Sequence, residues 1–285
     1  MNRIAYLLLA LILMALLLVN CNREVEFVPY KPQVVVEGQI ENGQYASVLL
    51  STSVSFTELM DTTSLLDHAI RNAKITISDG DKSEILLLKV NKKKIPPYEY
   101  VTQRMKGEIG KTYTLTIEYD DKIISAETYI PEPVIIDSLW FSKKTPSDRI
   151  GYVHISFKNV SNHHYRIATK EESEDIYIPC LYGNVDKTLY PKETQIKMQI
   201  NKGPIIFPET SYTSYFPDSV DIKVKLSTQL QASYDFWTSY QNEIINSQNP
   251  IFPSTQRLKS NVKGGIGIWA GYGSSVKTIS GKDYQ

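Results

Sequence analysis

Residues 113–119 read Tyr113-Thr114-Leu115-Thr116-Ile117-Glu118-Tyr119, with bulky and polar side chains in alternation. Successive side chains of a strand point to opposite faces of a sheet, so this alternation predicts a half-buried β-strand. Asp120-Asp121 follows at once, and apolar residues resume from Ile123 to Tyr129. Because aspartate is typical of tight turns, the three segments together predict a β-hairpin.

The same alternation recurs through residues 32–131. Further strand-like segments lie at 34–36, 45–50, 73–77, 85–90 and 98–101. Turn-forming residues separate them, including Asn42-Gly43, Asp79-Gly80-Asp81 and the segment from Gly107 to Gly110. About seven short strands at this spacing predict an immunoglobulin-like β-sandwich over 32–131. Residues 58–72 are the exception, and we expect a loop or a short helix there.

Pro131-Glu132-Pro133 interrupts the pattern, because proline removes a ladder donor and disfavours helix in the residue before it. We place a domain boundary there. Strand-like segments then resume at 135–141, 152–157, 165–169, 175–180, 194–200 and 220–226. The fold class is therefore predicted as mainly β, with an N-terminal immunoglobulin-like β-sandwich and a second mainly-β domain over 132–285.

One amphipathic helix is expected within the second domain, at about residues 228–247. Its apolar side chains recur at steps of three and four residues, namely Leu226, Leu230, Tyr234, Trp237 and Ile244. Thr228 and Gln231 match a capping box, and Asn249-Pro250 ends the segment. We interpret the aromatic side chains of this stripe as core packing.

The first 21 residues have the form of a bacterial lipoprotein signal. Arg3 precedes an apolar run from Ile4 to Val19, which is shorter than the ~20 residues that span a bilayer. Leu18-Val19-Asn20-Cys21 then matches a lipobox. We predict a signal peptide at 1–20, a lipid on Cys21 and a linker over 21–31. Two acyl chains or more would hold the protein stably at a membrane.

One residue departs from the usual lipobox, and it leaves alternatives open. The position before the cysteine normally holds Gly, Ala or Ser, whereas this chain has Asn20. An uncleaved single-span anchor and an ordinary secretory signal are the other interpretations, and both still export the chain. Asn22, in place of an aspartate, favours the outer membrane over the inner membrane.

Charge and cysteine content exclude two classes of protein. The chain has 31 Lys and Arg against 31 Asp and Glu, a formal net charge of +0, and no basic stripe. Nucleic acid is therefore not an expected partner. There are 2 Cys, so lipidation of Cys21 leaves Cys180 without a disulfide partner in the chain. We interpret Cys180 as a small buried apolar residue.

No motif in the sequence identifies a catalytic, cofactor or metal site. Gly265-Ile266-Gly267 lacks the strand-to-helix context of a phosphate loop, and we expect its glycines to let a strand pass close to a neighbouring backbone. Adjacent His163 and His164 on a strand would point to opposite faces. Glu171, Glu172, Glu174 and Asp175 lack the spacing of a calcium loop, so a solvated loop is the favoured interpretation.

Tyrosine is the residue type that most suggests a binding surface. The chain has 19 Tyr, and tyrosine combines apolar area with a polar tip. Tyrosine is also a good strand former, which is the alternative explanation. The candidate partner-binding residues lie in or beside the irregular stretch between Gly183 and Pro217, and they are Tyr182, Tyr190, Tyr212, Tyr215 and Phe216.

Several segments, in this order, resemble one family of bacterial envelope proteins. They are Val35-Val36-Glu37-Gly38, the stretch from Ala73 to Gly80, Gly110-Lys111-Thr112-Tyr113, Ala126 to Pro133 with Ile136-Asp137-Ser138-Leu139, the Tyr234 helix, and Asn261 to Trp269. The chain is in this respect similar to the Bacteroidota outer-membrane lipoproteins grouped as domain of unknown function 4249. The resemblance implies an exported, lipid-anchored, two-part β protein, often encoded beside TonB-dependent transporters, and implies no catalytic residues.

The expected function is that of a non-enzymatic accessory lipoprotein of the outer membrane. It would bind a TonB-dependent transporter or its cargo, with no cofactor and no metal. One alternative is an envelope hydrolase, which would show a deep pocket with paired carboxylates. A structural or adhesive envelope module, with a flat apolar patch, is the other.

Overall fold

A computed structural model describes residues 30–54, 66–92, 94, 96–160, 162–203, 213–247 and 258–281. The predicted signal peptide, Cys21 and most of the linker lie outside these residues. So do residues 58–65 of the segment expected as a loop or short helix. Residues 33–285 form one unit, and the description that follows concerns that unit alone.

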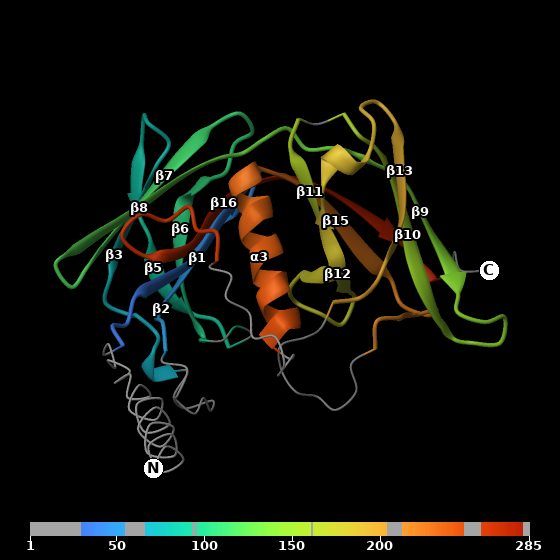
Figure 1. Cartoon of the computed structure of the whole chain (residues 1–285), viewed down its shortest axis with the longest axis horizontal. Coiled ribbons are helices and arrows are strands. Elements are labelled where there is room, and N and C mark those ends of the chain that lie inside the picture. The colour runs from blue at the N-terminus through green and yellow to red at the C-terminus, as the bar shows by residue number, and fades with distance from the viewer. Residues whose placement is uncertain are drawn as a thin grey trace, which may run out of the picture. The chain divides into compact units, whose positions relative to one another are not determined.

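The described residues of the unit form three β-sheets and one long helix (Figure 1). The strands are β1 Val34–Glu41, β2 Tyr45–Thr52, β3 Lys74–Ser78, β4 Ser83–Ile85, β5 Leu87–Val90, β6 Tyr98–Lys106, β7 Thr112–Tyr119, β8 Lys122–Tyr129, β9 Ile136–Lys143, β10 Ile150–Lys158, β11 His164–Glu171, β12 Ile178–Val185, β13 Gln195–Ile200, β14 Phe216–Pro217, β15 Ile222–Gln229 and β16 Ile266–Ile279. The helices are η2 Lys187–Leu189 and α3 Gln231–Ser247. The mainly-β prediction is confirmed.

The hairpin predicted from residues 113–129 is present as β7 and β8. Both turn residues have left-handed backbone angles, with φ of 48° at Asp120 and 56° at Asp121. Two positive φ values are what a two-residue hairpin turn of type I′ requires, and aspartate tolerates them better than most residues. The alternation also decides burial, because Tyr113, Leu115 and Ile117 are fully buried.

The first half of the unit is a β-sandwich. A four-stranded sheet in the order β4-β3-β7-β8 packs against strands β1, β2 and β6 of an eight-stranded sheet. Ile75 and Ile117 from the smaller sheet share one hydrophobic core with Val36 and Val48 from the larger sheet. Since the two inner faces carry the apolar residues of each alternating strand, this is the arrangement that the sequence pattern predicts.

The second half repeats this arrangement with different strands. β10 pairs with β9 on one side and with β13 and β14 on the other, and this small sheet faces β11, β12 and β15. Phe157 and Ile155 of β10 pack in one core with Tyr165 of β11 and Val224 of β15. Phe157 and Tyr165 meet edge to face, with their ring centroids 4.9 Å apart.

The two sandwiches share one sheet, whose order is β12-β11-β15-β16-β1-β2-β6-β5. Strand β16 joins them, because residues 266–272 pair in parallel with β1 and residues 272–279 pair antiparallel with β15. Trp269 of β16 is fully buried in the first core, where its indole Nε1 donates to the carbonyl of Tyr113 at 2.9 Å. The prediction that all of 132–285 belongs to the second domain therefore needs correction for β16.

The glycines of β16 act as the sequence suggested. A Cβ on Gly267 would collide with the carbonyl oxygen of Val36, and one on Gly273 would collide with that of Pro131. Gly267 also has φ of 127°, a backbone conformation that favours glycine. The expectation of close backbone approach is confirmed.

Helix α3 begins later than the sequence predicted. Thr228 is a fully buried residue of β15, and it pairs with Tyr165 on one side and Gly273 on the other. The predicted capping box at Thr228 and Gln231 is therefore wrong, and so is the inclusion of Leu226 in the helix stripe. Pairing of β15 on both edges outweighs the local capping signal. Asn249-Pro250 lies outside the described residues.

Candidate functional site

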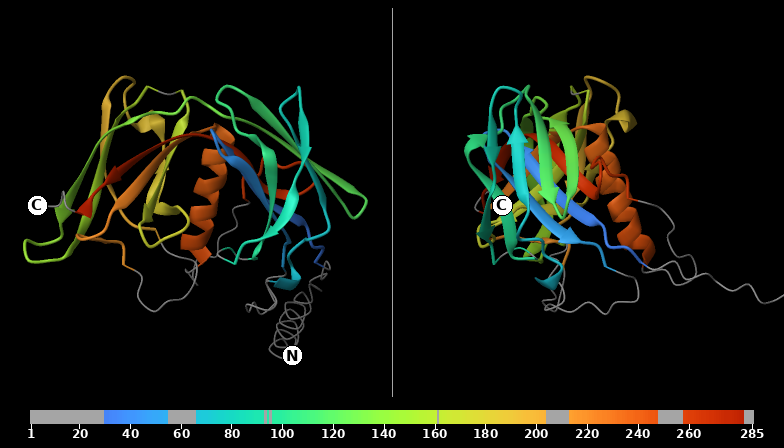
Figure 2. Two further views of the ribbon diagram at one scale, coloured as in Figure 1. Left: turned by 180° about the vertical axis from the view of Figure 1, so that it is seen from behind. Right: turned by 90° about the vertical axis from the view of Figure 1, so that its left-hand side faces the viewer.

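Helix α3 covers part of the outer face of the shared sheet, the face turned away from both cores (Figures 1 and 2). A small apolar cluster holds it there, in which Phe236 and Trp237 meet Ile268, Ala270 and Tyr272 of β16. Ring stacking and hydrogen bonds supply further contacts. Sheet and helix are therefore joined by apolar and polar contacts together, whereas the two sandwich cores are apolar.

Four hydrogen-bonding side chains meet between α3 and the sheet. Trp237 Nε1 donates to the Tyr272 hydroxyl at 2.8 Å, and Ser233 Oγ lies 3.3 Å from the same oxygen. Ser233 Oγ also donates to Gln229 Oε1 at 3.1 Å. Ser233 and Gln229 are buried, and their hydrogen bonds offset the free-energy cost of removing these polar groups from water.

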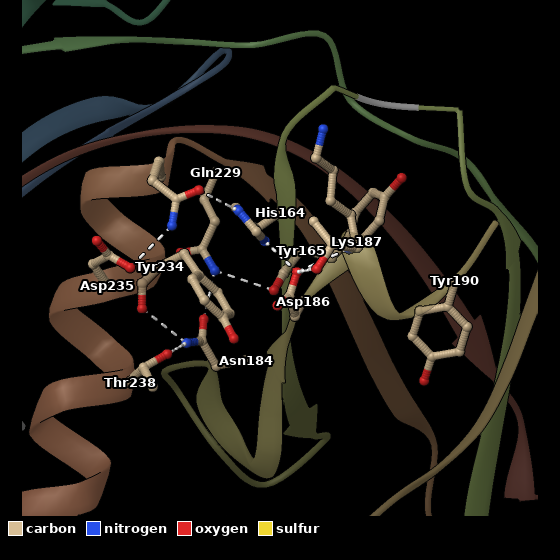
Figure 3. Close-up of polar contacts among 12 residues, drawn as sticks. His164, Tyr165, Asn184, Asp186, Lys187, Tyr190, Gln229, Tyr234, Asp235 and Thr238 are labelled. Carbon is tan, nitrogen blue, oxygen red and sulfur yellow. Dashed lines mark hydrogen bonds and ion pairs between the residues drawn. The ribbon is translucent and has the colours of Figure 1, made fainter. Parts of the chain in front are cut away.

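Asn184 of β12 ties the edge of the sheet to the helix (Figure 3). Its Nδ2 donates to the Tyr234 carbonyl at 3.0 Å and to Thr238 Oγ1 at 2.7 Å. Its Oδ1 accepts from Gln229 Nε2 at 2.5 Å, and the same Gln229 nitrogen donates to the Tyr165 carbonyl. One asparagine thus connects three elements.

His164 belongs to the same network rather than to a metal site. Its ring stacks on Tyr234 at 4.1 Å between centroids, and its Nε2 lies 2.7 Å from Gln231 Oε1. Its Nδ1 lies 3.3 Å from Asp186 Oδ1 (Figure 3). Burial raises the pKa of Asp186, but hydrogen bonds from Thr188 outweigh this and lower that pKa below its ordinary value. In the described part of the chain, no three His, Cys, Asp or Glu side chains form a group that could hold a metal.

A small hollow, open to solvent, lies beside α3, over strands β1 and β2. Glu37 and Gln39 of β1, Ser47 of β2, and Trp237 are among the residues that line it. Lys94, from the loop between β5 and β6, closes one side. Its ammonium donates to Glu99 Oε2 at 2.5 Å and lies 3.3 Å from Ser47 Oγ.

Arg166 of β11 lies against the indole of Trp237. Its guanidinium carbon is 3.6 Å from the ring centroid, a cation–π contact. Nη1 is buried and has no hydrogen-bond partner within the described ranges. Burial lowers the pKa of Arg166 from its ordinary value, and Tyr272 and Glu37 oppose that change.

A lysine from another part of the chain pairs with two carboxylates of the acidic loop at 171–175. Lys202 Nζ lies 2.7 Å from Glu171 Oε1 and 3.0 Å from Glu174 Oε1. All three side chains are largely buried. The ammonium therefore neutralises Glu171 and Glu174 in a largely buried ion-pair cluster, which the sequence did not predict. Glu172 and Asp175 are exposed, as expected for a solvated loop.

Cys180 is buried, as the sequence suggested. Burial raises the pKa of its thiol to about 12, although Thr169 and Arg166 lower it slightly. A thiol that stays protonated is a poor nucleophile. Cys180 therefore serves packing in the second core.

The candidate tyrosine positions have different surroundings. Phe216 is fully buried in the second core, so its prediction as a surface contact is corrected. Tyr190 packs against the same core. Tyr182 is 67% exposed with φ of 58°, a strained backbone conformation for a tyrosine. Tyr212 lies outside the described residues.

Tyr215 lies in a group of aromatic residues that the sequence analysis did not single out. Its ring meets Tyr152 of β10 edge to face at 5.1 Å, and Lys144 Nζ lies 4.4 Å from its centroid. On the same face of that sheet, Trp140 of β9 stacks on His154 of β10 at 5.1 Å. We call Trp140, Tyr152, His154 and Tyr215 the aromatic band. The alternation of Tyr152 and His154 with buried Val153 and Ile155 was the signal available in the sequence.

Hydrogen bonding within the band separates the acidities of its two tyrosines. The hydrogen bond with Tyr152, with a further contribution from Lys144, lowers the pKa of Tyr215 from its ordinary value. The same contact raises the pKa of Tyr152. The band is thus a polarised aromatic surface with a cation at its margin.

Comparison with known proteins places the chain in a family. Among the described residues, no helix has the length and apolar character needed to cross a membrane. No curated protein matches the chain. A chain of a cytokine receptor complex is 10% identical, with a TM-score of 0.24, over 86% of this chain and 96% of that one. A two-domain fibronectin type III segment of chicken tenascin is 11% identical, with a TM-score of 0.21, over 70% and 91%. The family model described as Domain of unknown function (DUF4249) matches residues 23–278, and the chain therefore belongs to that family.

Proposed function

We propose that this protein is an exported lipoprotein of a Bacteroidota outer membrane, anchored through a lipid on Cys21. In this proposal it is a non-enzymatic accessory protein that binds a TonB-dependent transporter or the cargo of that transporter. Its two joined β-sandwiches would carry the binding surfaces, and the linker over 21–31 would connect them to the lipid.

The sequence around Cys21 supports the anchor. A basic residue, an apolar run from Ile4 to Val19 and the Leu18-Val19-Asn20-Cys21 motif occur in the order that a lipoprotein signal requires. The match to the family model starts at residue 23, two positions after Cys21.

The aromatic band is the observation that carries the binding role. Trp140 is 39% exposed, and Tyr152, His154 and Tyr215 are partly exposed beside it. Aromatic residues are enriched at protein interfaces because they bury a large area at a small cost in conformational entropy. The band also lies on the outer face of β9 and β10, which the second core leaves uncovered.

Isolation from native outer membranes in a mild detergent tests the binding role. The full chain should co-purify with a transporter barrel, and Tyr152→Ala with Tyr215→Ala should abolish this. Tyr45→Ala is the matched control, because Tyr45 is an exposed strand tyrosine with Lys106 at 4.9 Å, as Lys144 is beside Tyr215. Repeated isolation without any barrel, or equal loss with the control, would refute the binding role.

Mass spectrometry of the intact protein tests the anchor separately. The mature chain should begin at Cys21 and carry the mass of a diacylglycerol and a further acyl chain. A protein that keeps Met1, or one with an unmodified Cys21 thiol, contradicts the anchor.

A further inference from the structure

The hollow beside α3 has a chemical character of its own. One wall is the indole of Trp237, and the floor presents the Glu37 carboxylate and the Gln39 amide from alternate positions of β1. Both side chains are exposed, and no hydrogen bond of either is found in the part of the chain that the structure describes. Hydrogen-bonding groups thus face the hollow beside an aromatic surface.

Donors and acceptors are both present around the hollow. Glu37 only accepts hydrogen bonds, Gln39 both donates and accepts, and Lys94 only donates. Ser47 of β2 adds a hydroxyl, which accepts from Lys94 and donates to Glu99. A ligand that matches this set must itself carry several groups that donate and accept, as vicinal hydroxyl groups do.

The charges near the hollow balance. Glu37 and Lys94 line it, Lys94 Nζ lies 2.5 Å from Glu99 Oε2, and the guanidinium carbon of Arg166 lies 3.6 Å from the ring centroid of Trp237. The lining thus has one acidic and one basic side chain, and each has an opposite or balancing charge near it. The cation behind Trp237 also opposes a second cation in front of that ring. A neutral ligand suits this balance better than a charged one.

We propose that this hollow binds a neutral polyhydroxylated ligand, a single sugar ring or the terminal ring of a glycan. The C–H face of the sugar would pack on the indole of Trp237, and its hydroxyl groups would donate to Glu37 and accept from Gln39 and Lys94. The hollow is small and open to solvent, so it would contact one ring and not a chain of rings. The proposal is independent of the lipid anchor, because every residue named lies within 33–285.

Saturation-transfer NMR tests this with the full chain in a detergent that has no sugar headgroup. Methyl glucoside and methyl galactoside at millimolar concentration are the probes, with choline and acetate as the cationic and anionic comparisons. At least one glycoside should receive saturation, and choline and acetate should receive none. Glu37→Gln and Gln39→Ala should each weaken glycoside binding about ten-fold, the effect of losing one hydrogen bond to a charged or buried group.

Matched variants separate this site from the rest of the surface. Trp237→Phe should weaken binding, whereas Trp140→Phe, in the aromatic band, should leave it unchanged. Glu127→Gln, at an exposed position of β8, is the control for Glu37→Gln. Because Glu37 and Gln39 are exposed, their variants should fold normally. Absence of binding by both glycosides, binding unaffected by the Glu37 and Gln39 variants, or preference for choline or acetate would each overturn the proposal.

Discussion

The two faces of the eight-stranded sheet are built by the same strands but by different interactions. On β1, Val36 and Ile40 point into the first core and are almost fully buried, whereas Glu37 and Gln39 on the opposite face are exposed. The inner face is held by apolar area, which is non-directional. The outer face holds α3 by a small apolar cluster together with specific hydrogen bonds, which are directional. The two faces should therefore respond differently to substitution.

The largest effect is expected on the inner face, at Trp269. Trp269→Ala should lower the free energy of unfolding by about 3–5 kcal/mol, because it leaves a cavity between the sheets and removes the indole hydrogen bond to the Tyr113 carbonyl. Urea denaturation of the two proteins measures this. Trp140→Ala, at an exposed tryptophan, should cost less than about 1 kcal/mol. Equal losses from the two variants would show that β16 does not join the first core.

A smaller effect is expected on the outer face, at Asn184. Asn184→Ala removes the partners of the Tyr234 carbonyl, Thr238 and Gln229, and should cost about 1–3 kcal/mol. Hydrogen exchange should show that amides of α3 lose protection while those of β16 keep theirs. Asn72→Ala, at an exposed asparagine, serves as the control. Uniform loss of protection throughout the unit would mean that α3 is not held separately.

The difference between the faces also explains what could be predicted from the sequence. Alternation predicted the core-facing side of all three sheets: the segments around Val36, Leu115 and Ile155 are strands, and those three residues are buried. The pairing of β1 with β16 could not be predicted, because parallel pairing joins residues more than 200 positions apart without a local signal. Local signals misplaced the start of α3, because Thr228 is paired on both edges of β15 and therefore belongs to the strand.

The candidate sites lie where local pattern is least informative. Tyr215 was predicted as a partner-binding residue because it is a tyrosine in an irregular stretch. The other members of the aromatic band, such as Tyr152 and Trp140, come from strands β10 and β9, which are distant in the sequence. The hollow combines β1, β2, α3 and a loop, and no spacing rule relates Glu37 to Trp237. Phe216 was misassigned because exposure of an aromatic residue depends on tertiary packing.

A third kind of contact joins the two sheets of the first sandwich at their edge, and it depends on pH. Glu84 of β4 accepts hydrogen bonds from the backbone N–H groups of Gln103 and Met105 at 2.6 Å, and from that of Arg104 at 3.1 Å. Burial raises the pKa of Glu84, but these three donors outweigh burial and lower it below the ordinary 4.5. Glu84→Gln should therefore cost about 1–2 kcal/mol at neutral pH.

The pH dependence follows from the direction of that shift. A carboxyl with a lowered pKa in the folded protein stabilises it above the unfolded pKa of about 4.5, and this contribution disappears as pH falls through the folded value. The difference in unfolding free energy between wild type and Glu84→Gln should thus be constant above about pH 5 and shrink below it. Glu127→Gln, at an exposed carboxylate, should show no such change. A difference that is independent of pH would contradict the role of the ionised carboxylate.

The smallest expected effect is a gain in stability, at one of the few polar residues of the inner face. Thr228 is fully buried in β15, and its Oγ1 has no hydrogen-bond partner among the residues that the structure describes. A buried hydroxyl without a partner loses its hydration and gains nothing in return. Thr228→Val keeps the branched shape that suits a strand and should raise the free energy of unfolding by about 0.5–1 kcal/mol. Thr169→Val is the informative comparison, because the Thr169 hydroxyl is buried but lies 3.9 Å from the Cys180 sulfur, a weak partner. Its gain should be smaller, and a loss of stability in Thr228→Val would show that the inner face uses this hydroxyl.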